Sequence, residues 1–263
     1  MVMQEMAFGL IIIGDEILSG KRQDKHFAKV RELLAERALK LAWVQYLPDD
    51  RSRLIAALRH SFAGDDIVFS CGGIGATPDD HTRQSAAAAL DVPLLLHPQA
   101  RDLVAQHMDE IQQPLTPERL RMGELPQGSL LIPNPYNGIA GFTLRQHHFV
   151  PGFPVMAWPM IEWVLESYYR ELFGKGGETE RGMVVRDLNE GALTPLLEAV
   201  EREFADIHVY SLPHIDAEHG SAHHAEQRIR YEIDLGVKGA AEKIDAAFKR
   251  LQAGVLQLGG TIV

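Results

Sequence analysis

Short apolar runs alternate with amphipathic segments through the first part of the chain. A continuous apolar run is typical of a strand that is buried on both faces of a parallel sheet. An amphipathic segment with apolar residues at helical spacing is typical of a helix that covers such a sheet. Strands are expected at Ala7–Ile13, Leu41–Leu47 and Asp66–Ser70, and helices at Lys25–Lys40, Arg51–Phe62 and about Asp79–Leu90.

The pattern continues with shorter elements to about residue 172. Helical spacing over Arg101–Arg121 is broken at Pro114–Pro117, and a last helix follows a turn at Pro151–Pro154. The strands are expected at Leu130–Pro133, Gly141–Leu144 and Gln146–Val150, and the last helix at Met156–Leu172. Strands that alternate with helices imply right-handed βαβ units with helices on both faces of the sheet. We therefore expect the α/β class, as a three-layer α/β/α domain with a mostly parallel sheet.

The pattern changes across the glycine-rich segment Gly174–Glu178, whose composition is typical of a linker. Beyond it, strands and helices follow in the order β-α-β-β-α, which indicates a small α+β domain. The strands are expected at Met183–Arg186, Ile207–Leu212 and Arg228–Val237, and the helices at Gly191–Phe204 and Ala240–Leu251. The sequence thus predicts two domains, residues 1–173 and 180–263.

Composition and charge narrow the class of protein. Of the 263 residues, 46% are hydrophobic, which is enough to bury a core, and the net charge is −10. Nucleic acid binds a basic face, so an acidic chain is a poor partner for it. No apolar run approaches the roughly 18 residues of a membrane span, and the N-terminus lacks the basic segment of a signal peptide. A single cysteine excludes an internal disulfide, and we expect a cytoplasmic protein that binds neither nucleic acid nor membranes.

The run Gly72-Gly73-Ile74-Gly75-Ala76-Thr77-Pro78-Asp79-Asp80 indicates the clearest chemistry. Its glycines follow a predicted strand and let a ligand approach the backbone closely. Thr77 is expected as the N-cap of the next helix, with Pro78 at the first helical position and Asp80 at the third. A helix N-terminus favours an anion, and a divalent cation would bridge the two aspartates to phosphate oxygens. The alternative is that both carboxylates only cap the helix.

A second run, Gly14-Asp15-Glu16-Ile17-Leu18-Ser19-Gly20, follows the first predicted strand. Ligands of open α/β sheets bind beyond the carboxyl ends of the strands. Asp15 and Asp80 are therefore expected to face one crevice, with Glu16 and Ser19 nearby. The alternative is a turn with solvated acids.

Loops rich in proline and glycine form a third group of candidates. They are Leu130-Leu131-Ile132-Pro133-Asn134-Pro135-Tyr136-Asn137-Gly138 and Pro151-Gly152-Phe153-Pro154. Stiff loops between strands can line a pocket, although turn geometry is their more common role.

In combination, these runs resemble the competence/damage-inducible protein A (CinA) family. Their order and spacing match over about residues 7–172. The domain of that family is similar to the molybdopterin-binding proteins MoaB and MogA. By its pattern alone, the stretch 180–263 resembles the small KH-like domain that follows in CinA.

The resemblance implies a pocket for the phosphate of a pterin or nucleotide. The preferred function is hydrolysis of a nucleotide-like pyrophosphate of the ADP-ribose type with a divalent metal such as Mg²⁺. The first alternative is adenylyl transfer to molybdopterin in molybdenum cofactor biosynthesis, and the second is a molybdopterin- or nucleotide-binding module without catalysis. Asp80 and Asp15 are the expected catalytic residues, and these two with Asp79 are the expected metal ligands. The residues expected to bind phosphate or ligand are Gly14, Ser19, Gly72, Gly73, Ile74, Gly75, Thr77, Asn134, Pro151 and Gly152.

Cysteine, histidine and tryptophan residues have simpler interpretations. Cys71, between a strand and the glycines, is expected to be a small buried thiol. The histidines of Pro213–Glu226 are expected in a solvated loop rather than at a metal. Trp158 and Trp163 are expected in the core or at an interface between copies, and we expect a homo-oligomer.

Overall fold

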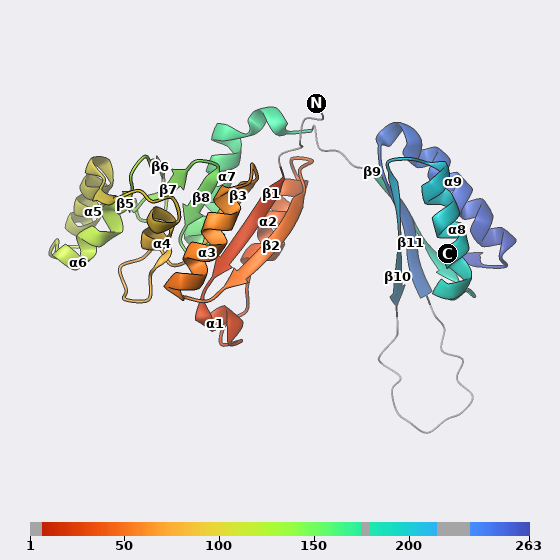
Figure 1. Cartoon of the computed structure of the whole chain (residues 1–263), viewed down its shortest axis with the longest axis horizontal. Helices are drawn as coiled ribbons and strands as arrows, with labels where there is room; N and C mark the ends of the chain where they lie inside the picture. Colours follow the sequence, from red (N-terminus) through yellow and green to blue (C-terminus); the bar gives the residue numbers. More distant parts are fainter. Residues whose placement is uncertain (1–6, 175–178, 215–231) are drawn as a thin grey trace, which may run out of the picture. The chain divides into compact units, whose positions relative to one another are not determined.

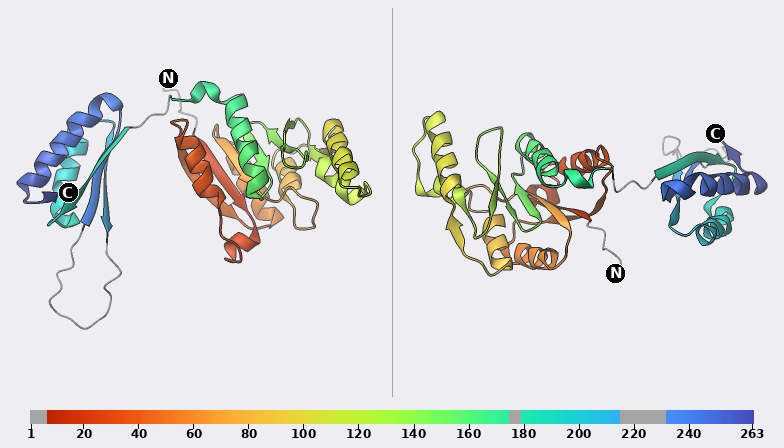
Figure 2. Two further views of the ribbon diagram at one scale, coloured as in Figure 1. Left: turned by 180° about the vertical axis from the view of Figure 1, so that it is seen from behind. Right: turned by 90° about the horizontal axis from the view of Figure 1, so that it is seen from above.

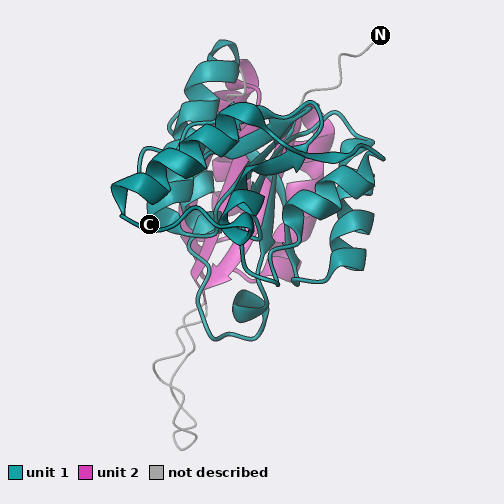
Figure 3. Ribbon diagram, turned by 90° about the vertical axis from the view of Figure 1, so that its left-hand side faces the viewer, with its two compact units in different colours: residues 1–176 teal, residues 177–263 magenta. Residues whose placement is uncertain are grey.

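The computed structural model describes residues 7–174, 179–214 and 232–263. The chain forms two compact units, residues 1–176 and 177–263 (Figure 1 and Figure 3). The buried apolar side chains of each unit pack within that unit. Within the histidine-rich segment, His219, His223 and His224 lie outside the described residues, as do the first residues of the strand expected at Arg228–Val237.

The first unit is built on a mostly parallel sheet with the strand order β2-β1-β3-β8-β7-β6. The first four strands in that order are parallel to one another, whereas β7 is antiparallel to both β8 and β6. The strands are β1 (Phe8–Ile13), β2 (Leu41–Leu47), β3 (Ile67–Cys71), β6 (Leu130–Ile132), β7 (Gly141–Leu144) and β8 (His147–Val150). This arrangement confirms the predicted α/β class.

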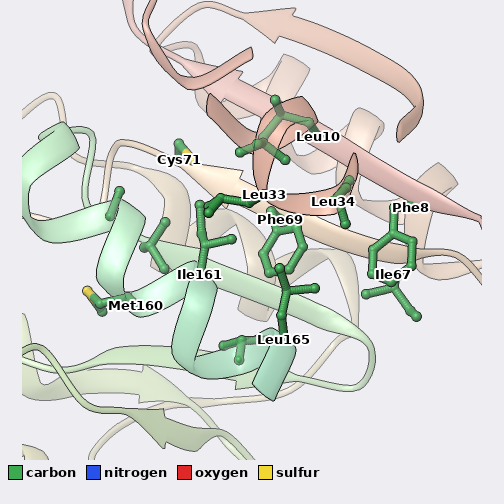
Figure 4. Close-up of a cluster of buried hydrophobic side chains, with 14 of the residues drawn as sticks. Phe8, Leu10, Leu33, Leu34, Ile67, Phe69, Cys71, Met160, Ile161 and Leu165 are labelled. Atoms are coloured by element: carbon green, nitrogen blue, oxygen red, sulfur yellow. The ribbon is translucent and has the colours of Figure 1, made fainter. Parts of the chain in front are cut away.

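Alternate residues of the central strands enter two separate cores. Phe8, Leu10 and Ile12 of β1 face helices α2 (His26–Ala35) and α7 (Pro154–Tyr168). Ile11 and Ile13 face the opposite side, which is covered by α3 (Arg51–Phe62) and α4 (Thr82–Ala89). Figure 2 shows these layers in two further views, and Figure 4 shows the first core in close-up. Burial on both faces explains why the sequence of β1 is apolar throughout.

The chain's tryptophans all belong to the first unit. Trp158 and Trp163 on α7 pack against the core that α2 also covers. Trp43 on β2 packs against the opposite core and donates a hydrogen bond from Nε1 to Asp66 Oδ2 at 2.7 Å. The sequence contains three tryptophans, so the second unit has none.

A lobe inserted after α4 was only partly predicted. It contains a separate antiparallel pair, β4 (Leu94–Leu96) with β5 (Glu124–Pro126), that the sequence pattern did not reveal. Between these strands lie α5 (Pro98–Glu110), α6 (Pro117–Leu120) and the 3₁₀ helix η1 (Arg121–Gly123), so the helical stretch expected at Arg101–Arg121 is broken before Pro117, as predicted. Both α-helices begin at a proline, where a missing N–H costs nothing.

The second unit is an α+β fold with the sheet order β10-β11-β9-β12, in which neighbouring strands are antiparallel. The predicted β-α-β-β-α order is confirmed, and a short last strand follows it. The elements are β9 (Thr179–Arg186), α8 (Glu190–Glu203), β10 (Ile207–His214), β11 (Glu232–Gly239), α9 (Ala241–Gln257) and β12 (Thr261–Ile262). Both helices contribute apolar side chains to the same core, so they cover one face of the sheet.

Limited proteolysis should separate the two units. Because each unit has its own core, cleavage within Gly174–Glu178 should release a stable fragment of about residues 1–173. Mass spectrometry of a time course would identify the first cut. Initial cleavage between residues 20 and 150 would contradict the predicted boundary.

Candidate phosphate-binding pocket

A cavity of about 410 Å³ opens at the carboxyl ends of β1, β3 and β8. This is the edge at which open α/β sheets bind ligands. Its walls are formed by the residues that follow each strand: Gly14 after β1, Gly72–Thr77 after β3, and Pro151–Phe153 after β8. Asn134 and Asn137 from the loop after β6 and Met122 from the lobe also line the cavity.

The first residues of α4 donate hydrogen bonds to the glycine loop after β3. The Thr82 hydroxyl donates to the Gly72 carbonyl at 3.0 Å, and the Thr82 N–H donates to the Gly73 carbonyl at 3.0 Å. The guanidinium of Arg83 donates to the Gly75 carbonyl. Three carbonyls of the loop are therefore directed away from the pocket.

The amide groups of the same peptides point in the opposite direction, because C=O and N–H are antiparallel in a planar trans peptide. These are the N–H groups of Gly73, Ile74 and Ala76. Among the described residues, none of the three has a hydrogen-bond acceptor. Successive unpaired N–H groups at the wall of a cavity form a concave site that suits an anion.

Glycine is required at two positions of this loop. Gly72 has φ +111° and Gly73 has φ +67°, a region that side chains disfavour. A Cβ on Gly73 would lie 2.2 Å from the Thr82 hydroxyl, and one on Gly72 would lie 2.4 Å from the Ile13 carbonyl oxygen. The loop can therefore pack against α4 and β1 only without side chains.

The segment Thr77–Asp80 is a turn, so the prediction that Thr77 caps the next helix is wrong. The Asp80 N–H donates to the Thr77 carbonyl at 3.1 Å, and α4 begins only at Thr82. The Asp80 carboxylate accepts from the Thr77 N–H at 2.8 Å and from its hydroxyl at 2.5 Å. Pro78 occupies the second position of the turn, which fits its fixed φ as well as a helix start does. The Thr77 hydroxyl donates to Asp80 and thus holds the turn rather than a helix N-terminus.

Asp15 is directed toward Asp49 and does not line the cavity. Its N–H donates to Asp49 Oδ2 at 2.9 Å, and the Asp49 N–H donates to Asp15 Oδ1 at 3.3 Å. Asp49 itself lines the cavity with Glu16. Burial raises the pKa of Asp49, and the charges of Glu16 and Asp79 act in the same direction. The carboxylates at this end of the pocket are therefore close enough to repel one another.

Most of the other predicted residues do line the cavity. Those brought together are Gly14, Gly72, Gly73, Ile74, Gly75, Thr77, Asp79, Asp80, Asn134, Pro151 and Gly152. Ser19 lies outside the lining, at the end of the short helix α1 (Asp15–Leu18). The expected set missed Arg22, Asp49 and Met122, which also face the cavity. Asp49 follows β2, and the rule that placed Asp15 at a strand end would have found it as well.

Hydrogen bonds fix the two proline- and glycine-rich loops. Asn134 donates from Nδ2 to Asn137 Oδ1 at 2.7 Å and to the Ile139 carbonyl at 3.0 Å. Buried His26, at the start of α2, uses Nε2 to bond the Gly152 carbonyl at 2.9 Å. Both loops are thus stiff walls of the pocket.

Comparison with known proteins connects this pocket to a family. Residues 9–171 match the family described as a probable molybdopterin binding domain. The chain belongs to this molybdopterin-binding domain family. The match spans the glycine loop, both proline- and glycine-rich loops and α7, which together surround the cavity.

Individual relatives agree with this placement. A CinA-like protein of Citrifermentans bemidjiense is 32% identical over 199 residues, which are 73% of this chain and 47% of that protein. The chain thus spans about half the length of this CinA-like relative. A protein of Aeropyrum pernix is 26% identical over 96% of this chain and 95% of its own length. The crystal structure of CinA from Thermoplasma acidophilum, described as of unknown function, has a TM-score of 0.55 and 24% identity over 61% of this chain and 96% of its own. The predicted resemblance to CinA is confirmed.

The described residues contain neither a ready-made cluster of metal ligands nor a helix suited to crossing a membrane. In residues 7–174, 179–214 and 232–263, no three or more His, Cys, Asp or Glu side chains converge as a ready metal site. Over the same ranges, no helix combines the length and apolarity that a membrane crossing requires.

Cys71, which precedes the glycine loop of the molybdopterin-binding domain, should be inert toward thiol reagents. The side chain is buried, and burial strongly raises the pKa of the thiol. Because only the thiolate reacts, we expect labelling by a disulfide reagent at pH 8 to be at least about 100-fold slower in the folded protein than in urea. Absorbance of the released thiol would measure both rates. Equal rates would show that the strand end opens readily.

Proposed function

We propose that the molybdopterin-binding domain binds a pterin or nucleotide through its phosphate and hydrolyses a nucleotide-like pyrophosphate of the ADP-ribose type. The observation that carries this proposal is the set of unpaired N–H groups on Gly73, Ile74 and Ala76. Backbone amides that are held in place before a ligand arrives stabilise phosphate charge at little reorganisation cost. The cavity of about 410 Å³ falls in the range of small-molecule sites.

The charges of the pocket fit a divalent cation as the partner of that phosphate. Glu16, Asp49, Asp79 and Asp80 line the cavity, and Arg22 is the basic residue among the lining side chains. A phosphate alone would be repelled by these carboxylates. Mg²⁺ needs only one or two protein carboxylates when substrate phosphates supply further ligands, so a preformed cluster of three is not required. Asp79 and Asp80 are the side chains we assign to hold the ion.

The proposed reaction transfers a phosphoryl group to water. The water oxygen forms a bond to one phosphorus, the bridging P–O bond breaks, and the leaving phosphate keeps the bridging oxygen and its electron pair. The water proton passes to solvent or to a lining carboxylate. A divalent ion, when bound, would neutralise phosphate charge and lower the pKa of the attacking water. The protein's part is to orient the phosphate on the glycine loop.

Family membership favours a second candidate that uses the same pocket. Because residues 9–171 match a probable molybdopterin binding domain, the ligand can be a pterin, and adenylyl transfer to molybdopterin is the alternative reaction. A binding module without catalysis is the remaining alternative.

Turnover assays separate these candidates. The purified chain with ADP-ribose and Mg²⁺ or Mn²⁺ should release AMP and ribose 5-phosphate, and EDTA should abolish the release. Chromatography would quantify both products. Turnover of ATP with molybdopterin instead would establish adenylyl transfer. Tight binding measured by calorimetry, without turnover of either substrate pair, would support the binding module.

A further inference from the structure

Arg83, the second residue of α4, is a buried arginine directly behind the glycine loop. Only 2% of its surface is exposed, and its Nε is buried without a hydrogen-bond acceptor. Within the part of the chain that the structure describes, no carboxylate forms an ion pair with it. Arginine remains protonated in proteins, and buried charges are normally paired. A positive charge without a close counter-ion therefore lies beside the pocket.

The guanidinium connects the glycine loop to strand β5 of the inserted lobe. One nitrogen donates to the Gly75 carbonyl, and another donates to the Glu124 carbonyl at 3.3 Å. The first bond fixes the peptide between Gly75 and Ala76, and so directs the Ala76 N–H away from α4. The second bond anchors β5, which packs beside α4 (Figure 1). Met122, two residues before Glu124, lines the cavity.

Nearby carboxylates balance the charge of Arg83 only in part. Burial lowers the pKa of the guanidinium, and the charges of Asp80 and Glu124 oppose that shift. The Asp80 carboxylate already accepts two hydrogen bonds from Thr77. A charge in a poorly solvated position acts strongly on an anion nearby, because little water screens it.

We infer that Arg83 is the positioning residue for the ligand's phosphate: it orients the Ala76 N–H toward the phosphate, and the bound phosphate supplies the counter-charge that Arg83 lacks. The inference rests on the proposed phosphate-binding function. It does not depend on hydrolysis, so binding and turnover test the two ideas separately.

The test compares Arg83→Lys with Arg83→Gln. Both side chains can donate to one carbonyl, but only lysine keeps the charge. The probe is α,β-methylene-ADP with Mg²⁺, which carries a diphosphate that water cannot cleave at the bridge. Calorimetry should show that Arg83→Gln weakens binding by roughly 10- to 100-fold, the scale of a hydrogen bond that involves a charge. Arg83→Lys should recover most of the lost affinity.

Arg59→Gln is the matched control, because Arg59 on α3 has a side chain that is 61% exposed and lies away from the cavity lining. It should bind the probe like the wild type.

Thermal melts would establish that each variant folds, and Arg83→Met would replace Arg83→Gln if Arg83→Gln does not fold. Equal losses of probe affinity in the lysine and neutral variants would show that Arg83 has only a structural role. Unchanged affinity in the neutral variant would overturn the inference. A wild-type protein that does not bind the probe would also overturn it. ADP-ribose turnover without probe binding would contradict the role of Arg83 and leave the proposed hydrolysis intact. Probe binding that depends on Arg83, without turnover, would support the role of Arg83 and contradict the proposed hydrolysis.

Discussion

Gly73→Ala should abolish measurable turnover of ADP-ribose and destabilise the first unit. The added Cβ would lie 2.2 Å from the Thr82 hydroxyl, in a backbone conformation with φ +67°. The strained φ costs about 1–2 kcal/mol and the overpacking about 1–3 kcal/mol. Moving Thr82 would also release the carbonyl of Gly72, so the N–H groups would lose their orientation. We expect the free energy of unfolding to fall by about 2–5 kcal/mol and turnover to fall by roughly 100-fold or more.

Gly128→Ala separates backbone strain from the effect on the pocket. Gly128 has φ +89°, and an added Cβ would have nothing within 4 Å. This variant should lose only about 1–2 kcal/mol of stability, from the strained φ, and should keep turnover and probe affinity. Chemical denaturation and the ADP-ribose assay would measure both quantities. A Gly73→Ala protein with normal turnover would show that the loop does not hold the substrate.

Asp80→Asn should lose metal-dependent turnover by roughly two orders of magnitude while keeping its fold. The Asn side-chain oxygen can still accept from the Thr77 N–H and hydroxyl, so the turn should persist. A loss of about 1 kcal/mol would shift the melting temperature by only a few degrees in a protein of this size. The charge that would hold a divalent ion is gone, so activity should fall strongly even though stability changes little.

Asp109→Asn provides the control for removing one negative charge. Asp109 is exposed on α5 and lies outside the cavity lining, so this variant should retain full activity. Melting curves and metal titrations of both variants would show whether the Asp80 carboxylate holds a metal ion or only stabilises the turn. If Asp80→Asn is less stable but fully active, its carboxylate only holds the turn, and the binding-module alternative becomes the better account.

The glycine loop was predictable because its cause is local. Glycines that directly follow an apolar strand indicate a close backbone approach, and Gly72 and Gly73 have the positive φ values that require glycine. The alternation of strands and helices likewise predicted the sheet and its two covered faces. The pair β4 and β5, with three residues in each strand, was not predicted, and its pairing joins segments about 30 residues apart on either side of α5 and α6.

Contacts between residues far apart in the sequence fix the features of the site that the sequence did not predict. Thr77 and Pro78 fit a helix start and a turn equally well, and the choice is made by Thr82, which bonds back to Gly72 and Gly73. Asp15 lies at the expected strand end, yet its side chain bonds to Asp49 across the neighbouring strand. The contact of Arg83 with β5 joins residues 41 positions apart, which no local motif reveals.

Because only the first unit contains tryptophan, the two units differ in intrinsic tryptophan fluorescence. All three indoles pack against the cores of the first unit, so intrinsic tryptophan emission reports on that unit alone. Far-ultraviolet circular dichroism, in contrast, detects the helices of both units. A denaturation curve followed by emission and one followed by dichroism would therefore coincide only if both units unfold together. When they do not coincide, the difference between the curves isolates the second unit without any label.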